Sequence, residues 1–159
     1  MELADLATLV AWFAEPAVAR WWNEPPDLAS VRAKYAPRIA GQVPTQMWIV
    51  EIDRSDAGLL QSYRHVDHPE HDAAVGIPRA VGIDYLLGAA HRGRGLAGLA
   101  LRGFAELVLE RHADAECCVA TPAQTNEVSW RALERAGFER RHACQAPGEP
   151  PGWAYAFQR

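Results

Sequence analysis

Residues 91–104 read HRGRGLAGLALRGF, a glycine-rich turn that leads directly into a helical pattern. The segment before it, VGIDYLL (81–87), is rich in apolar residues and predicts a strand. After the glycines, apolar side chains recur at helical spacing and predict a helix over about 95–111. A strand, a glycine turn and a helix in this order favour a site at which backbone N–H groups of a helix N-terminus bind a phosphate.

The glycines also match a dinucleotide-binding pattern. Gly93, Gly95 and Gly98 fit the G-x-G-x-x-G fingerprint letter for letter. A Rossmann unit requires an acidic residue at the end of the next strand, however, and that strand ends in Ala-Thr-Pro (120–122). The P-loop pattern fails as well, because Gly93 is followed by Arg-Gly rather than by Lys and Ser or Thr. A diphosphate on another carrier remains compatible with the glycines and the flanking arginines, and a tight turn with solvated arginines is the alternative.

The rest of the chain alternates between helical and strand patterns. We expect helices over 3–14, over 28–39 with Asp27 or Ser30 as its cap, and from Thr125 or Asn126 to Ala136 before Gly137; strands are expected over 47–53, 59–66, 80–87, 116–122, 138–144 and 153–158. Residues 21–27 predict a turn, and the polar stretch 67–80 a functional loop. This order predicts a single α/β or α+β domain over 1–159 rather than a doubly wound sheet.

Composition excludes several classes of protein. A hydrophobic fraction of 49% and a charged fraction of 23% are typical of a soluble globular domain. The net charge of −4 argues against nucleic acid and mildly favours a cationic substrate. No apolar run reaches the roughly 20 residues of a membrane span, and acidic residues stand where a signal peptide would be basic, so we expect a cytoplasmic protein. The three cysteines lack metal-ligand spacing; Cys117 and Cys118 are expected to be buried.

Two motifs carry a resemblance to a known family. Residues 92–97, RGRGLA, resemble the R/Q-x-x-G-x-G/A acetyl-CoA signature of the GNAT superfamily of N-acetyltransferases. Residues 126–138, NEVSWRALERAGF, resemble the N-x-x-S/A…E-K/R-x-G-F segment of that superfamily, at the expected separation. Upstream, RWW (20–22), QSY (61–63) and GIDYLL (82–87) resemble the aminoglycoside 6′-N-acetyltransferases and their siderophore-acylating relatives. The resemblance implies a mixed, mostly antiparallel central sheet flanked by helices, with the usual first strand short or missing here.

The resemblance also implies a binding site for acetyl-CoA as cosubstrate. Main-chain groups next to the glycine turn would pair with the pantetheine arm, and the turn itself would bind the diphosphate; these residues are Leu86, Leu87, Gly88, Arg92, Gly93, Arg94, Gly95, Leu96 and Ala97. Asn126 and Ser129 would face the same arm. A plain helix N-cap remains the alternative for Asn126, and an ordinary surface serine for Ser129.

Asp84 is the candidate catalytic base. It corresponds to the catalytic aspartate of the G-I-D segment in the resembled group. An amine must lose a proton before or during attack on a thioester, so the reaction needs a base. A carboxylate in an otherwise apolar strand costs free energy to bury unless it has a partner, which favours a functional role. A structural aspartate that hydrogen-bonds the glycine loop is the alternative, and His65 is a minor alternative base. Leu133 stands where many family members carry a tyrosine that protonates the departing thiolate, so water, Tyr85 or Tyr155 would have to serve.

The candidate acceptor side is aromatic and acidic. Its residues are Trp22, Tyr63, Asp67, Glu70 and Asp72, together with Asp84. The carboxylates would form an anionic rim for a polyamine, although loop charges are about as often merely solvated. His65, His68 and His71 repeat every third residue, but in a proline-broken loop without a helix to align them we expect no metal site.

The resemblance therefore implies an enzyme, an acetyl-CoA-dependent N-acetyltransferase similar to the aminoglycoside 6′-N-acetyltransferases. It would act on a primary amine by direct transfer, with Asp84 as the base. The partner is a small-molecule amine, with no nucleic acid or membrane, in a monomer or homodimer. Acylation of another amine, such as a siderophore precursor, is one alternative. A non-catalytic CoA-binding domain is the other, and Leu133 and the missing first strand favour it.

Overall fold

The computed structural model describes residues 1–158. In chain order its elements are η1 (Leu3–Asp5), α1 (Leu6–Phe13), α2 (Pro16–Trp22), α3 (Leu28–Ile39), β1 (Thr45–Ile52), β2 (Ser55–Arg64), η2 (His65–Asp67), α4 (Pro69–Val75), β3 (Ala80–Leu87), η3 (Ala89–His91), α5 (Leu96–Arg111), β4 (Cys117–Ala120), α6 (Glu127–Ala136), β5 (Glu139–Cys144) and β6 (Gly152–Gln158). Over these residues the strands form a six-stranded sheet in the order β1-β2-β3-β4-β6-β5. Parallel pairing of β3 with β4 and antiparallel pairing of β6 with both its neighbours make the sheet mixed, which confirms the predicted fold class.

The chain forms two compact units. The first consists of Met1–Gln61 with Tyr85–Arg92, and the second of Ser62–Asp84 with the chain from Gly93 onward. The boundaries fall inside β2 and inside β3, so each of these strands contributes to both units.

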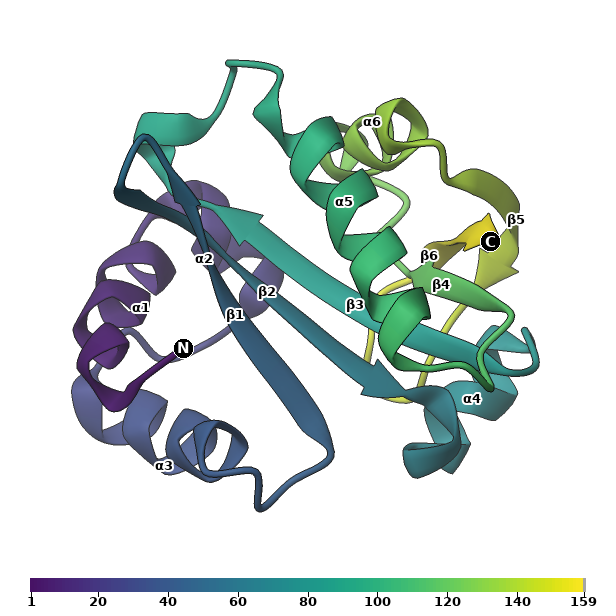
Figure 1. Ribbon diagram of the computed structural model, residues 1–159, viewed down its shortest axis with the longest axis horizontal. Coiled ribbons are helices and arrows are strands. Elements are labelled where there is room, and N and C mark those ends of the chain that lie inside the picture. The colour runs from purple at the N-terminus through teal and green to yellow at the C-terminus, as the bar shows by residue number, and fades with distance from the viewer. Residues whose placement is uncertain (159) are drawn as a thin grey trace. The chain divides into compact units, whose positions relative to one another are not determined.

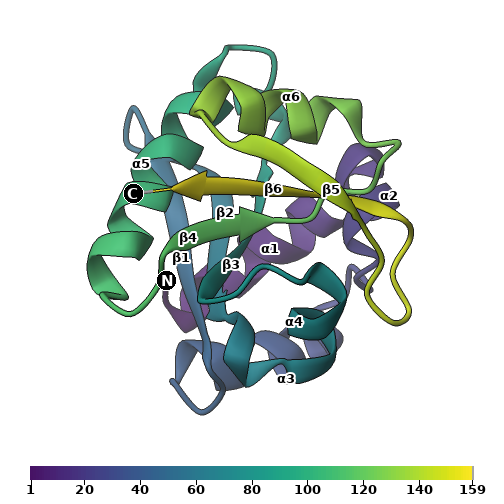
Figure 2. The same cartoon turned by 90° about the vertical axis from the view of Figure 1, so that its right-hand side faces the viewer.

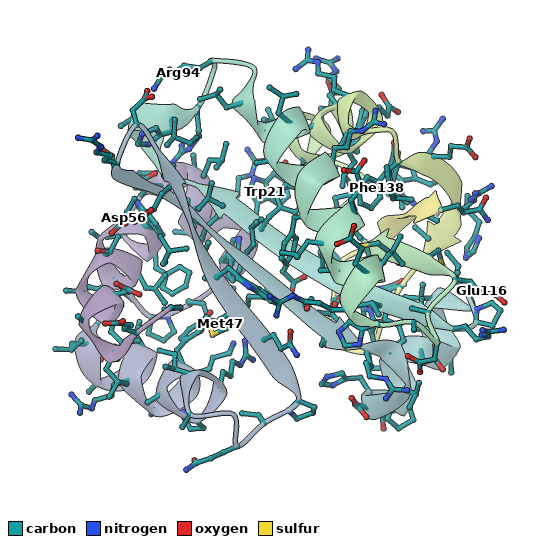
Figure 3. All side chains as sticks on the ribbon, in the orientation of Figure 1. Trp21, Met47, Asp56, Arg94, Glu116 and Phe138 are labelled. Atoms are coloured by element: carbon teal, nitrogen blue, oxygen red, sulfur yellow. The ribbon has the colours of Figure 1, made fainter. Side chains whose placement is uncertain are left out.

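The first unit contains α1, α2, α3, β1 and the first part of β2, together with the end of β3 (Figure 1). Its core consists of Leu6, Leu9, Trp12, Phe13, Val18, Val31, Tyr35, Met47, Leu59 and Leu86. Met47 projects from β1 into this core (Figure 3). Over residues 1–158 the first strand in chain order is β1, so the helices come before any strand, as the sequence predicts.

Two prolines in this unit start or extend a helix instead of ending one. Pro16 is the first residue of α2, where its missing N–H costs nothing, so Trp21 and Trp22, the first two residues of the predicted turn, are helical instead. Pro37 lies within α3, which continues to Ile39. Asp27 caps α3 by accepting a hydrogen bond from the Ser30 backbone N–H at 2.8 Å, as predicted.

The second unit places α5 and α6 next to one another on strands β3 to β6 (Figure 2). β3 and β4 pair at Ala80–Cys117, Val81–Cys118 and Gly82–Val119. Cys117 and Cys118 are both buried, as expected for small hydrophobic side chains. The predicted ends of α6 are confirmed, since Asn126 is its N-cap and Gly137, at φ 95°, its C-cap.

The expected loop over 67–80 is wrong. Within this stretch the chain forms α4, shortly after the short helix η2, which ends at Asp67. Pro69 is the first residue of α4, the position that tolerates proline, and Gly76 ends the helix at φ 64°. A proline followed by acidic and small residues is thus the start of a helix here and not a break.

The two glycines inside α5 have different roles, and this difference gives a stability prediction. A Cβ on Gly98 would lie 3.1 Å from Cβ of Arg135 on α6, whereas nothing lies within 4 Å of the corresponding position at Gly103. We expect Gly103→Ala to stabilise the protein by about 1 kcal/mol through helix propensity. Gly98→Val is expected to destabilise it by about 1–3 kcal/mol through overpacking against α6. Urea unfolding of both variants measures this, and equal effects at the two sites would contradict the packing role of Gly98.

Over residues 1–158, no helix combines the length and the apolar character that crossing a membrane requires.

Candidate active site

The glycine turn is shaped by backbone conformation. Gly93 and Gly95 have φ values of 73° and 75°, which lie in the left-handed region that residues other than glycine rarely adopt. Nothing lies within 4 Å of a Cβ at either position, so the outer side of the turn is open. Gly95 is the N-cap of α5, whose first N–H groups, as in any α-helix, have no partner within the helix. The turn therefore has the geometry of an anion site at a helix N-terminus.

The two arginines of this motif differ. Arg94 is exposed, and Figure 3 places it at the outer end of the turn. Arg92 is half-buried in the first unit, where its Nε donates to the Leu87 carbonyl at 2.8 Å and its Nη2 forms an ion pair with Glu15. The Arg92 charge is thus balanced within the protein, whereas the sequence suggested that it was available to a phosphate.

The N-terminus of α6 lies in the second unit. The Asn126 Oδ1 accepts a hydrogen bond from the Ser129 backbone N–H at 3.3 Å, so the helix-cap role considered for Asn126 is present. Leu133, at the position where the resemblance implies a tyrosine, is fully buried. Tyr155 on β6 is also buried, and its hydroxyl donates to Glu134 Oε1 at 3.0 Å. Burial is the larger cause and the hydrogen bond to Glu134 the smaller one, and together they raise the Tyr155 pKa to about 12. This phenol therefore keeps its proton at neutral pH.

Asp84 is half-buried on β3, in the second unit. Because side chains alternate along a strand, Asp84 shares a face of β3 with Gly82. A Cβ on Gly82 would lie 2.5 Å from the Tyr63 ring and 3.0 Å from Nε2 of His65. The absence of a side chain at Gly82 therefore lets Tyr63 and His65 of the neighbouring segment lie against the Asp84 face of β3.

Three histidines gather around Tyr63, and we refer to these four residues as the histidine cluster. The Tyr63 ring stacks on His65 at 6.1 Å and meets the edges of His68 and His71 at 5.1 and 5.9 Å between centroids. The His65 and His71 rings are perpendicular at 5.1 Å. The cluster depends on η2 and α4, which turn a three-residue repeat into a shared surface, so the sequence signal was present but was interpreted as a loop.

His65 is uncharged within the cluster at neutral pH. Its side chain is only 1% exposed, and burial, reinforced by repulsion from His71, lowers its pKa to about 4. Asp72 acts in the opposite direction from 3.6 Å, between its Oδ1 and His65 Nδ1. Within residues 1–158 no set of three or more His, Cys, Asp or Glu side chains is arranged to hold a metal ion.

The remaining acceptor-side candidates are divided between the units. Asp67 and Glu70 are exposed on η2 and α4, whereas Asp72 is half-buried beside His65. Trp22 belongs to the first unit, where its ring packs on Phe13 at 5.6 Å between centroids. The fold thus brings Tyr63 and Asp72 together with the histidines and gives Trp22 a role in core packing.

A mixed sheet, a glycine turn before α5 and a capped α6 agree with the resemblance to the GNAT class, and comparison with known proteins shows the family. The chain belongs to the acetyltransferase (GNAT) domain family, whose sequence pattern matches residues 2–146. It is 29% identical over 154 residues to the aminoglycoside N(6′)-acetyltransferases type 1 of Klebsiella pneumoniae and Serratia marcescens, covering 92% of this chain and 75% of each relative.

Solved structures agree with this assignment. The fold matches aminoglycoside acetyltransferase AAC(6′)-Ib in complex with coenzyme A at a TM-score of 0.85 and 27% identity, over 100% of this chain and 92% of that one. The complex of AAC(6′)-Ib with coenzyme A and kanamycin matches at 0.84, with the same identity and coverage. The predicted superfamily, its fold and the N-acetyltransferase class of enzyme are confirmed.

Proposed function

We propose that this protein transfers an acetyl group from acetyl-CoA to a primary amine of an aminoglycoside-like acceptor. The observation that carries the proposal is the match of the entire chain to an aminoglycoside acetyltransferase bound to both coenzyme A and kanamycin. The open glycine turn before α5 supports it independently, because it offers an anion site of the kind that a CoA diphosphate needs.

On the cosubstrate side, the backbone carries most of the recognition. We assign the diphosphate to the N–H groups of the turn over 93–97, where the positive φ of Gly93 and Gly95 exposes the main chain. The exposed Arg94 adds positive charge to this site. Main-chain groups of Leu86–Gly88 and the side chains of Asn126 and Ser129 are assigned to the pantetheine arm. In this assignment Asn126 acts in addition to its role as helix cap.

For the chemistry, the proposed base is Asp84. Asp84 takes one proton from the protonated amine, and the neutral nitrogen attacks the thioester carbonyl. The C–N bond forms, the C–S bond breaks, and the second proton on nitrogen passes to water. An aliphatic amine has a pKa of about 10 and is mostly protonated at neutral pH, so a proton acceptor is required. The departing thiol has a pKa of about 8.5, so it can leave as a thiolate without an acid at the Leu133 position.

On the acceptor side, Tyr63, Asp67, Glu70, Asp72 and Trp22 remain our candidates for contacts to a cationic substrate. The surplus of four negative charges over the chain favours such a substrate electrostatically. The buried Leu133 favours one alternative, a CoA-binding domain without catalysis, because the residue cannot donate a proton.

A thiol-release assay with acetyl-CoA and a panel of amines separates these alternatives. We expect turnover with kanamycin and with other aminoglycosides that carry a 6′-amino group. The matched control is an aminoglycoside with a hydroxyl at the 6′ position, which should give no release above background. CoA binding without turnover on any amine, including polyamines and siderophore-type diamines, would support the non-catalytic alternative instead.

A further inference from the structure

Glu15 lies at the junction of α1 and α2 in the first unit, far in sequence from the glycine motif. It is the N-cap residue of α2, in an extended backbone conformation, and its side chain is 23% exposed. Its Oε1 accepts a hydrogen bond from the backbone N–H of Ala89 at 3.1 Å. Its Oε2 forms an ion pair with Nη2 of Arg92. One carboxylate thus binds both the start of η3 and the residue that follows it.

Other contacts fix the same segment from the first unit. The Gly88 N–H donates to the Ala57 carbonyl at 2.9 Å. The indole Nε1 of Trp12 lies 2.5 Å from where a Cβ on Gly88 would be, so only glycine fits against this ring. Arg92 in turn donates to the Leu87 carbonyl, which ties the end of η3 back to the end of β3.

The ion pair is sheltered from water. Oε2 of Glu15 and Nη2 of Arg92 are both buried atoms. When one charge of such a pair is removed, the other is left buried without compensation, which is costly. The guanidinium of Arg92 is therefore committed to the protein, and its direct attraction for a phosphate is largely cancelled by Glu15.

We propose that Glu15 is a positioning residue for the cosubstrate: it holds residues 88–92 in one shape before CoA binds, through Ala89 and Arg92. This inference rests on the proposed function, which assigns CoA to the main chain of Leu86–Gly88 and of 93–97, the residues that precede and follow the segment held by Glu15. A preformed backbone site binds more tightly because less conformational entropy is lost on binding. It also gives the first arginine of the RGRGLA motif a role in shaping the loop.

The test compares Glu15→Ala, which removes both contacts, with Glu15→Gln, which keeps an acceptor for Ala89. We expect Glu15→Ala to raise the KM for acetyl-CoA and the Kd for CoA by about tenfold, the size of one or two charge-assisted hydrogen bonds. The kcat and the KM for the amine should stay within about twofold. The contacts of Glu15 with Ala89 and Arg92 do not involve the residues that we assign to the amine or to proton transfer. Glu15→Gln should raise the acetyl-CoA KM by less, about threefold. Glu51→Ala, at an exposed glutamate of β1 in the same unit, is the control and should change nothing.

Amide hydrogen exchange in the ligand-free protein provides a readout that does not depend on activity. The Ala89 amide should exchange faster in Glu15→Ala than in the wild type, and in Glu51→Ala it should not. If the wild type binds CoA and Glu15→Ala binds it equally well, the inference is overturned while the proposed function stands. If the wild type binds CoA but acetylates no amine, the function fails and the CoA Kd still decides the role of Glu15. If the wild type does not bind CoA, both fail.

Discussion

The Asp84→Asn variant is expected to lose about 10²- to 10³-fold in kcat/KM for the amine, the range typical for removal of a general base. Asparagine matches aspartate in size but cannot accept the proton that the attacking amine must lose. Because the CoA contacts assigned above do not involve this side chain, the Kd for CoA should change little. Steady-state kinetics with a turned-over aminoglycoside and calorimetric CoA binding measure the two quantities.

A pH profile separates a base from a merely structural aspartate. In Asp84→Asn the residual rate should rise by about tenfold per pH unit between pH 7 and 9, because it then depends on the small fraction of neutral amine. Asp56→Asn, at an exposed carboxylate of β2, removes the same charge and should retain wild-type activity (Figure 3). An Asp84→Asn variant that keeps more than a tenth of the activity would exclude Asp84 as the base.

Local signals predicted the part of the fold that surrounds the glycine turn. The strand over 80–87 is β3 to the residue, and α5 and α6 begin and end within a residue of the prediction. These elements are bounded by glycine or asparagine in positions where backbone conformation requires them, such as Gly95 and Gly137 with positive φ. Such boundaries are properties of the local chain, so they are readable without knowledge of the tertiary structure.

Prolines account for the two α-helices that were missed, α2 and α4. Pro16 and Pro69 were interpreted as helix breakers, yet each is the first residue of a helix. The first turn tolerates proline, so its effect depends on which side of it the helix lies, and this is decided by packing. The interpretation of 67–80 as a loop in turn concealed the histidine cluster, since without α4 the three imidazoles have no common surface.

Long-range contacts within each unit were beyond sequence reasoning for a different reason. Arg92 looked like a phosphate ligand because its partner, Glu15, is 77 residues away and belongs to a helix junction with no motif of its own. The contact of Tyr63 with Gly82 is likewise visible only once β2 and β3 are neighbours in the sheet. In both cases the sequence shows which side chain is polar or aromatic. The role of that side chain depends on a partner that only the fold brings close.

The protein should lose about 3 kcal/mol of folding stability between pH 6.5 and pH 4 because of His65 alone. The folded-state pKa of His65, about 4, lies below the ordinary histidine value of 6.5. In that interval His65 binds a proton in the unfolded chain but not in the folded protein, so protonation favours unfolding. The stability that the neutral, buried His65 contributes is fully present above pH 6.5 and is lost as the pH falls to about 4. A shift of 2.5 pH units corresponds to about 3 kcal/mol.

The neighbours of His65 in the described structure enter this prediction. His71 and His68 repel a charged His65, Asp72 of α4 attracts it, and Tyr63 and the backbone at Gly82 exclude water from it. Urea unfolding at pH 7 and at pH 4.5 measures the loss, and the variant His65→Gln, which cannot ionise, should show a pH dependence smaller by most of that amount. His112→Gln, at a half-exposed histidine in the same unit, should keep the wild-type pH dependence. An unchanged pH dependence in His65→Gln would show that the buried imidazole accepts a proton in the folded state, and that Asp72 outweighs burial and the two neighbouring histidines.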